Sequence, residues 1–233
     1  MSLRFRVADL QNELINLETL ARPRLPRTQH GRLRQLADEL LRFSQRPGTT
    51  TWGWPEDDPL VLAASAGAYQ PGRGGRERIV AKIDARWELR RVDKGTVEVA
   101  GLASVRVWFN EGALGMWRME LGDESAPGCF FHVQILGQDE GRPWPKSVDV
   151  PRLPGLVATP ASVVEFVLGE LFQDDWPKEV ARSRNAARQW QGVQRRWWTA
   201  MLGWQREIAA EAEGSPWAAI KAAKPDRDLL LAR

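Results

Sequence analysis

The chain has 233 residues, of which 43% are hydrophobic and 27% charged, with a formal net charge of +3. This composition is typical of a globular protein that buries a substantial core, and it argues against a disordered or fibrous chain. One cysteine and two histidines cannot make an internal disulfide or a zinc site of four cysteine and histidine ligands, so we expect no metal and no cofactor.

The beginning of the sequence, MSLRFRVADLQNEL, carries charged side chains every few positions. A secretory signal would need an unbroken apolar stretch there, and no run of 18 apolar residues occurs elsewhere. We therefore expect a protein of a bacterial-type cytoplasm that makes no contact with a membrane.

The first 46 residues predict a helical hairpin. Leucine and valine recur from Leu3 to Leu17 at alternating steps of three and four, which favours an amphipathic helix to about residue 21. The segment ARPRLPR contains two prolines and must interrupt it, and the leucines from Leu33 to Leu41 indicate a second helix. The turn between them is basic, and Arg24 and Arg27 are candidate partner-binding residues.

Residues 47–76 read as loops around a small apolar element. They contain the segment GRGG, residues 72–75, which could hold a phosphate. The full phosphate-loop motif is absent, however, and such segments are usually simple turns.

Residues 77–137 predict an antiparallel meander of about four strands. Alternation of polar and apolar residues and the intervening turn segments place the strands at residues 78–92, 95–109, 115–121 and 129–136. Bulges could interrupt the first two. Alternation also implies that one face of the sheet is buried and the other polar.

A proline-rich connection follows, and helices are predicted beyond it. Thr159 and Pro160 are typical of a helix start. The segment DDWP ends this helix, and Pro177 can open a long one that runs to about Glu213. A short helical piece is expected at residues 217–223.

The long helix has the clearest pattern in the sequence. At 100° per residue, its large apolar residues share one side, and an arginine stripe lies almost opposite: Arg184, Arg188, Arg195 and Arg206. We interpret this stripe as a contact surface for nucleic-acid phosphates or for an acidic protein, with Trp198 at its edge able to stack on a base. The competing interpretation is an ordinary solvated helix face.

A second candidate site lies on the polar face of the sheet. Arg118 and Glu120 share one side of their strand, as do His132 and Gln134, with Arg86, Glu88 and Arg106 as possible neighbours. A carboxylate base, an imidazole and a guanidinium could serve phosphodiester hydrolysis. The same residues are also typical of the solvent-exposed face of an open antiparallel sheet. Cys129 should lie on the opposite side from His132, so a cysteine–histidine nucleophile would need a bulge.

These patterns together predict an α+β protein in three segments: a helical hairpin (1–46), an antiparallel sheet with loops (47–158) and a helical region (159–233), joined in one compact domain. The expected function is non-catalytic binding, as an adaptor that contacts nucleic acid or an acidic protein through the arginine stripe. The alternative is a hydrolase or nuclease that uses Glu120, His132 and Arg118. The apolar seams at residues 3–17 and 190–208 could also close a homo-oligomer.

Overall fold

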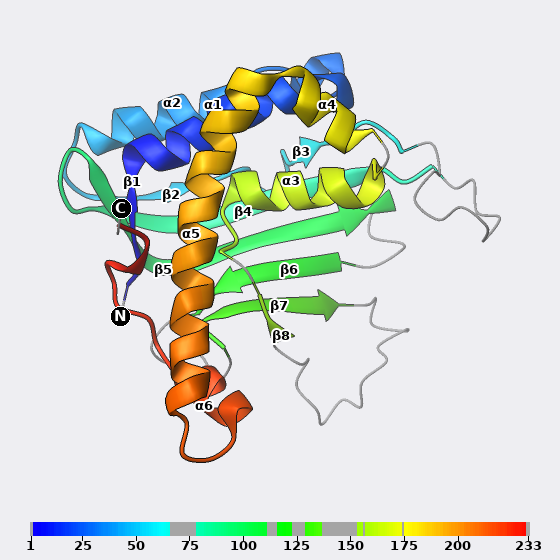
Figure 1. The fold of residues 1–233 in the computed structure, drawn as a ribbon. Coiled ribbons are helices and arrows are strands. Elements are labelled where there is room, and N and C mark those ends of the chain that lie inside the picture. Colours follow the sequence, from blue (N-terminus) through cyan, green and yellow to red (C-terminus); the bar gives the residue numbers. More distant parts are fainter. Residues whose placement is uncertain are drawn as a thin grey trace, which may run out of the picture.

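The structure is a computed structural model that describes residues 2–65, 78–110, 116–122, 129–136, 153–155, 157–173 and 175–231. It confirms the predicted α+β class: one antiparallel sheet with helices on one of its faces (Figure 1). The GRGG segment, the turn residues 111–115 and 123–128, and most of the proline-rich connection lie outside the described residues, so those predictions remain open.

The centre of the sheet is the predicted meander. It consists of β4 (Ala81–Arg91), β5 (Thr96–Phe109), β6 (Met116–Leu121) and β7 (Phe131–Leu136), each paired with the next. The register of β4 against β5 shifts between Trp87 and Leu89, which is an irregularity of the kind anticipated for these strands.

Four short strands extend the sheet in places where no strand was predicted. They are β1 (Arg4–Arg6) beside β5, β2 (Thr49–Trp52) and β3 (Leu60–Val61) beside β4, and β8 (Leu153–Pro154) beside β7. The prediction of a loop at 49–52 was therefore wrong, whereas β3 lies within the small apolar element that was expected in this segment. Strands this short have too few residues to show a period, and the backbone groups of their long neighbours fix them.

The N-terminal helix begins later than its apolar periodicity indicated. Helix α1 spans Val7–Ala21, whereas Leu3 precedes β1 and its carbonyl accepts a hydrogen bond from the Val99 amide at 2.9 Å. Leu3 and Phe5 are both buried, so alternation along β1 continues the same apolar seam. Helix α2 (Arg32–Ser44) follows the hairpin turn as predicted.

The helix after the proline-rich connection is capped as expected. Helix α3 spans Pro160–Leu171, and the Thr159 side chain accepts a hydrogen bond from the Ser162 amide at 3.0 Å. The cap leaves one fewer amide without a partner in the first turn.

The single long helix that was predicted after it is two helices. Helix α4 spans Trp176–Arg182, and α5 spans Arg184–Glu211. Ser183 separates them with φ −105° and ψ 59°, outside the helical region. No proline or glycine marks this break; α4 is held by the hairpin turn, while α5 crosses α1 (Figure 1). Helix α6 (Pro216–Ala222) follows α5, and a 3-10 helical turn spans Leu229–Leu231. No helix in the described part of the chain is long and apolar enough to cross a membrane.

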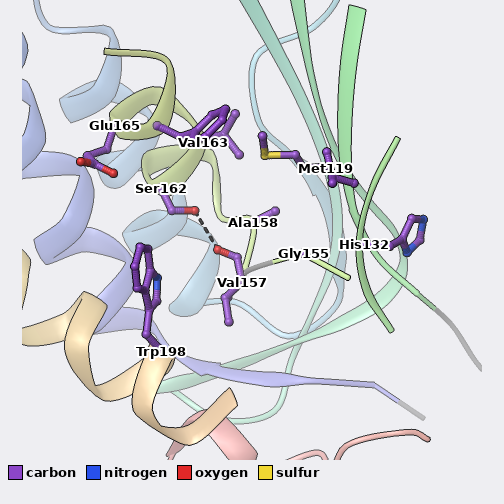
Figure 2. Close-up of a pocket in the computed structure, with 11 residues that line it drawn as sticks. Met119, His132, Gly155, Val157, Ala158, Ser162, Val163, Glu165 and Trp198 are labelled. Atoms are coloured by element: carbon purple, nitrogen blue, oxygen red, sulfur yellow. Dashed lines mark hydrogen bonds between the residues drawn. The ribbon is translucent and has the colours of Figure 1, made fainter. Parts of the chain in front are cut away.

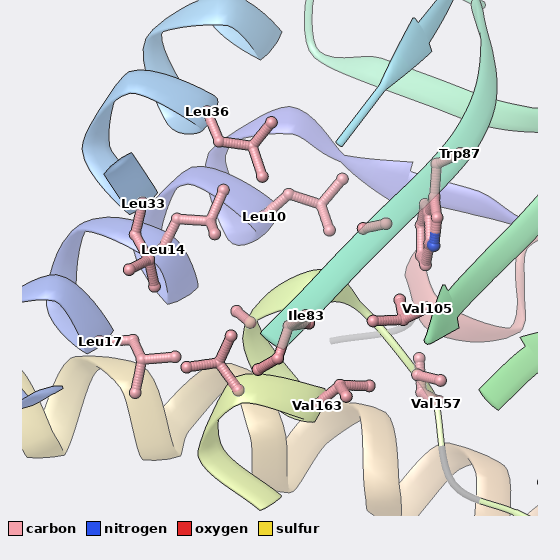
Figure 3. Packing of buried hydrophobic residues seen from close by; sticks show 14 of the residues in the cluster. Leu10, Leu14, Leu17, Leu33, Leu36, Ile83, Trp87, Val105, Val157 and Val163 are labelled. Atoms are coloured by element: carbon pink, nitrogen blue, oxygen red, sulfur yellow. The ribbon is translucent and has the colours of Figure 1, made fainter. Parts of the chain in front are cut away.

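One apolar core joins the helices to the sheet. Figure 3 shows leucines of α1 and α2 facing Ile83 and Trp87 of β4, with Val163 of α3 below them. Aromatic rings continue this core: Phe5 lies 5.2 Å from Trp87 and 5.5 Å from Trp197 of α5, centroid to centroid. The two apolar seams considered for a homo-oligomer are thus packed within a single chain.

Gly53 holds a tight approach between the 53–54 segment and β4. Its φ is 142°, and a Cβ there would lie 1.9 Å from the carbonyl oxygen of Ala85. We expect Gly53→Ala to lower the free energy of unfolding by about 3 kcal/mol, because backbone strain and steric overlap add.

Gly48 supplies the matched control. Its φ is 130°, but a Cβ there would meet nothing within 4 Å. Gly48→Ala should therefore cost only the strain, about 1 kcal/mol. Urea denaturation of both variants measures the difference, and equal losses would show that the contact with Ala85 carries no energy.

Candidate functional site

The arginine stripe lies on the outer face of α5. Its four members, Arg184, Arg188, Arg195 and Arg206, are all exposed. Within the described part of the chain none of the four forms an ion pair. Between Arg184 and Arg206 the sequence contains no acidic residue, so this face stays positive over about 33 Å at 1.5 Å per residue.

The inner face of α5 explains why these four arginines point outward. Trp190, Val193, Trp197 and Met201 are buried against α1 and the sheet, as the periodicity predicted. Arg196 lies between the two faces and turns to α1, where its guanidinium binds the Asp9 carboxylate at 2.6 Å. It is therefore a structural arginine.

Arg24 of the hairpin turn also has an internal role. It binds Asp175 at 2.9 Å and Glu179 at 3.3 Å, and its guanidinium lies 4.9 Å from the centroid of the Phe172 ring. The Arg24 guanidinium is thus engaged within the chain, which weakens the case for Arg24 as a partner-binding residue. A sequence could not show this, because the carboxylates lie 151 and 155 positions away.

The same contacts place the basic turn near the beginning of the arginine stripe. Arg24 fixes the turn to α4, and α4 directly precedes α5 (Figure 1). Arg22 and Arg27 of this turn are exposed. Arg27 therefore remains a candidate, and the positive surface extends from α5 toward the hairpin turn.

The polar sheet residues converge across four strands. Glu120 lies opposite His132 on one side and opposite Ser104 on the other, and Arg118 lies opposite Gln134 and Arg106. Arg86 of β4 is opposite Ser104, so two of the three possible neighbours, Arg86 and Arg106, continue the same cross-strand rows. Glu88 lies at the register shift of β4 and pairs with Arg86 at 2.9 Å.

His132 is enclosed in a complete set of hydrogen bonds. It is 3% exposed, its Nδ1 lies 2.8 Å from the Cys129 carbonyl oxygen, and its Nε2 lies 3.1 Å from Glu120 Oε2. Both ring nitrogens therefore face acceptor oxygens of the protein. Such a ring has no free nitrogen with which to take a proton from a substrate.

The Glu120 carboxylate is also bound by neighbouring side chains, His132 and Arg118. Burial acts to raise the pKa of its carboxyl, but the hydrogen bond from His132 and the charge of Arg118 outweigh burial and lower the pKa. Arg118 lies 3.3 Å from Glu120 and also donates to Gln134 Oε1. A carboxylate with a lowered pKa is a weak base, and this arrangement suits a structural network better than general base catalysis.

The Cys129 thiol does not complete a nucleophilic pair. The histidine ring contacts the carbonyl of Cys129, and burial raises the pKa of its thiol. A reactive cysteine needs the opposite change.

Truncation of His132 tests the structural interpretation of the sheet network. His132→Ala removes both hydrogen bonds and leaves the half-buried Glu120 carboxylate with one partner fewer. We expect a loss of about 2 kcal/mol in the free energy of unfolding, with no change in binding at the arginine stripe. A variant as stable as the parent would contradict this interpretation, and loss of a phosphodiesterase activity present in the parent would favour the enzyme.

The sheet also bears a polar hollow at the edge of β4. Arg106 binds Asp84 at 2.7 Å and Glu56 at 2.5 Å, and the Trp108 indole donates to Asp84 at 2.6 Å. Arg106, Asp84 and Glu56 line a cavity of about 520 Å³ together with Thr51 and Arg86. Because Arg106 is held by two carboxylates, its charge is largely neutralised.

A buried carboxyl between α1, α3 and α5 was not anticipated. Glu13 is 0% exposed, accepts hydrogen bonds from Thr159 Oγ1 at 3.0 Å and from the Gln194 amide, and its pKa is raised strongly, chiefly by burial. Glu13 occupies a position on the apolar side of α1, between Leu10 and Leu14. That interruption was the only signal in the sequence. We find no group of three or more potential metal ligands among the residues described.

A second cavity lies between α3, α5 and the strands β6 and β7. Its volume is about 250 Å³, and its walls are mostly apolar (Figure 2). Trp198 of α5 forms part of the rim of this cavity. The sequence had placed Trp198 only at the edge of the arginine stripe.

Comparison with known proteins adds no functional assignment. No protein-family model, curated protein or solved structure matches this chain. The function must therefore be inferred from the geometry of the chain itself.

Proposed function

We propose that this protein is a non-catalytic binding protein that contacts nucleic acid through the arginine stripe of α5. The observation that carries the proposal is the set of four exposed guanidinium groups on one helix face, none of them neutralised by a carboxylate of the described chain. When arginines neutralise the phosphates of a nucleic acid, the counterions condensed on those phosphates are released. This release makes binding favourable.

Two features favour nucleic acid over an acidic protein. Arginine presents a planar fork of donors that matches phosphate geometry, and the stripe contains no lysine. Trp198 is 38% exposed and lies three residues after Arg195. An exposed indole beside free arginines is the combination that single-stranded nucleic-acid sites use, because bases stack on the ring while phosphates bind the cations.

The proposal fits a cytoplasmic, bacterial-type protein, the location expected from the sequence. Its adaptor role would consist of holding a nucleic acid while other surfaces remain available. The hydrolase alternative has less support, because the Glu120, His132 and Arg118 side chains are already engaged with one another and with Gln134 and Cys129.

A salt titration tests the proposal. The purified chain is mixed with a fluorescently labelled oligonucleotide, and anisotropy is measured from 25 to 300 mM salt. If four phosphates contact the stripe, the logarithm of the association constant should fall with the logarithm of salt at a slope of about −3. No binding at the lowest salt would overturn the proposal, and tighter binding to an acidic polypeptide of the same length would assign the surface to a protein partner.

A further inference from the structure

The cavity beside the arginine stripe has the dimensions of a site for a single flat group. Its volume is about 250 Å³, whereas an apolar cavity of about 150 Å³ suffices for benzene. One or two fused rings fit such a space, and a peptide helix does not. Most of its lining is apolar, including Met119, Val133, Val157 and Val163.

Aromatic side chains stand at the rim of this cavity. Trp198 and Phe166 each line it and are each 38% exposed, and Leu202, one helical turn beyond Trp198, is 50% exposed. Figure 2 shows Trp198 on the α5 side of the cavity, with the sheet residue Met119 across from it. The His132 ring is turned away, so His132 contributes backbone to the wall.

Two polar side chains, Ser162 and Glu165, are among the residues that line the cavity. The Ser162 hydroxyl is already bonded to the Val157 and Thr159 carbonyls. Glu165 accepts a hydrogen bond from the Trp176 indole through Oε1 at 3.2 Å, and its Oε2 has no hydrogen-bond partner in the part of the chain described. Burial raises the pKa of this carboxyl.

We propose that the cavity accepts one unstacked nucleobase of a single-stranded nucleic acid whose phosphates lie along the arginine stripe. This inference rests on the proposed function and names its substrate class. The cavity and the stripe share α5, since Trp198 follows Arg195 by one turn, so a strand bound by its phosphates has a base within reach of the rim. Bases in a duplex remain stacked on their neighbours and cannot enter without being extruded.

Three labelled probes of equal length test the inference with the protein unchanged: a single strand, the same strand with abasic sugars in place of its nucleotides, and the duplex. The intact strand should bind at least tenfold more tightly than the abasic strand at equal salt, because only the base can enter the cavity. Tighter binding to the duplex than to the intact strand would overturn the inference.

Substitution of the rim tryptophan provides the second arm. Trp198→Ala should weaken binding of the intact strand about 5- to 100-fold and leave binding of the abasic strand unchanged. Trp217→Ala is the matched control, since Trp217 of α6 is 48% exposed and does not line the cavity. It should change neither affinity.

The outcomes separate this inference from the proposed function. Equal, salt-dependent binding of intact and abasic strands would leave the arginine stripe as a phosphate surface and overturn the nucleobase site. Failure of all three probes to bind would overturn both.

Discussion

Reversal of two charges, Arg184→Glu together with Arg195→Glu, should weaken nucleic-acid binding by about 100-fold or more at low salt. Both arginines are exposed and neither has an ion-pair partner within the described residues, so no internal contact is lost. Each phosphate contact contributes about 0.7 to 0.9 to the salt slope. Loss of two contacts should therefore flatten the slope by about 1.4 to 1.8, and repulsion by the new carboxylates adds to the loss of affinity.

The control must change net charge equally at another place. Arg42→Glu with Arg46→Glu does so, because both arginines are exposed, Arg42 in α2 and Arg46 just beyond its end. We expect this control to lose less than fivefold in affinity. Equal losses in both double variants would indicate attraction by overall charge, and unchanged binding after reversal on α5 would show that the stripe is not the contact surface.

Replacement of Glu13 should have the largest effect on stability among the polar residues. Glu13→Ala leaves the Gln194 amide and the Thr159 hydroxyl without their partner inside the core and creates a cavity between α1, α3 and α5. Each unsatisfied buried group costs about 1 to 3 kcal/mol, so the free energy of unfolding should fall by about 4 kcal/mol. A loss below 1 kcal/mol would contradict this account.

The isosteric change Glu13→Gln tests the charge separately. Because the folded-state pKa of Glu13 is raised above its usual value of 4.5, the folded protein binds the proton more tightly than the unfolded chain. The favourable contribution of this proton binding to the free energy of unfolding is complete below pH 4.5 and is lost as the pH rises through the folded-state pKa of Glu13. For one group the slope cannot exceed about 1.4 kcal/mol per pH unit.

Glu13→Gln should remove this decline, so that the variant exceeds the parent in stability at neutral pH and loses that advantage near pH 4. Urea denaturation at a series of pH values measures the difference. Glu207→Gln, at an exposed position on α5, should reproduce the parent curve. Parallel curves for the parent and Glu13→Gln would show that Glu13 does not titrate differently on folding.

The position of polar groups inside the helical layer could not be read from the sequence. Glu13 is bound by residues 146 and 181 positions away, so its role depends on how α3 and α5 cross α1. Arg24 and Arg196 were equally ambiguous, since an arginine on a helix or turn is free or paired according to which carboxylate the fold brings to it. The break between α4 and α5 at Ser183 likewise depends on tertiary contacts and has no proline or glycine to mark it in the sequence.

The polar network on the sheet was predicted in part from the sequence. Alternation placed Arg118, Glu120, His132 and Gln134 on a common face, and the register of β6 against β7 brings them together. Residue types alone were compatible with catalysis. Only the tertiary hydrogen bonds showed that both nitrogens of His132 are used.

The sequence by itself determined the α+β class, the four central strands, the Thr159 cap and the division of α5 into apolar and arginine sides, because these follow from local periods and capping chemistry. The tertiary structure decided which arginines are free, where Glu13 is buried and that Trp198 borders a cavity. Those properties depend on contacts between residues far apart in the chain, and no local pattern encodes them.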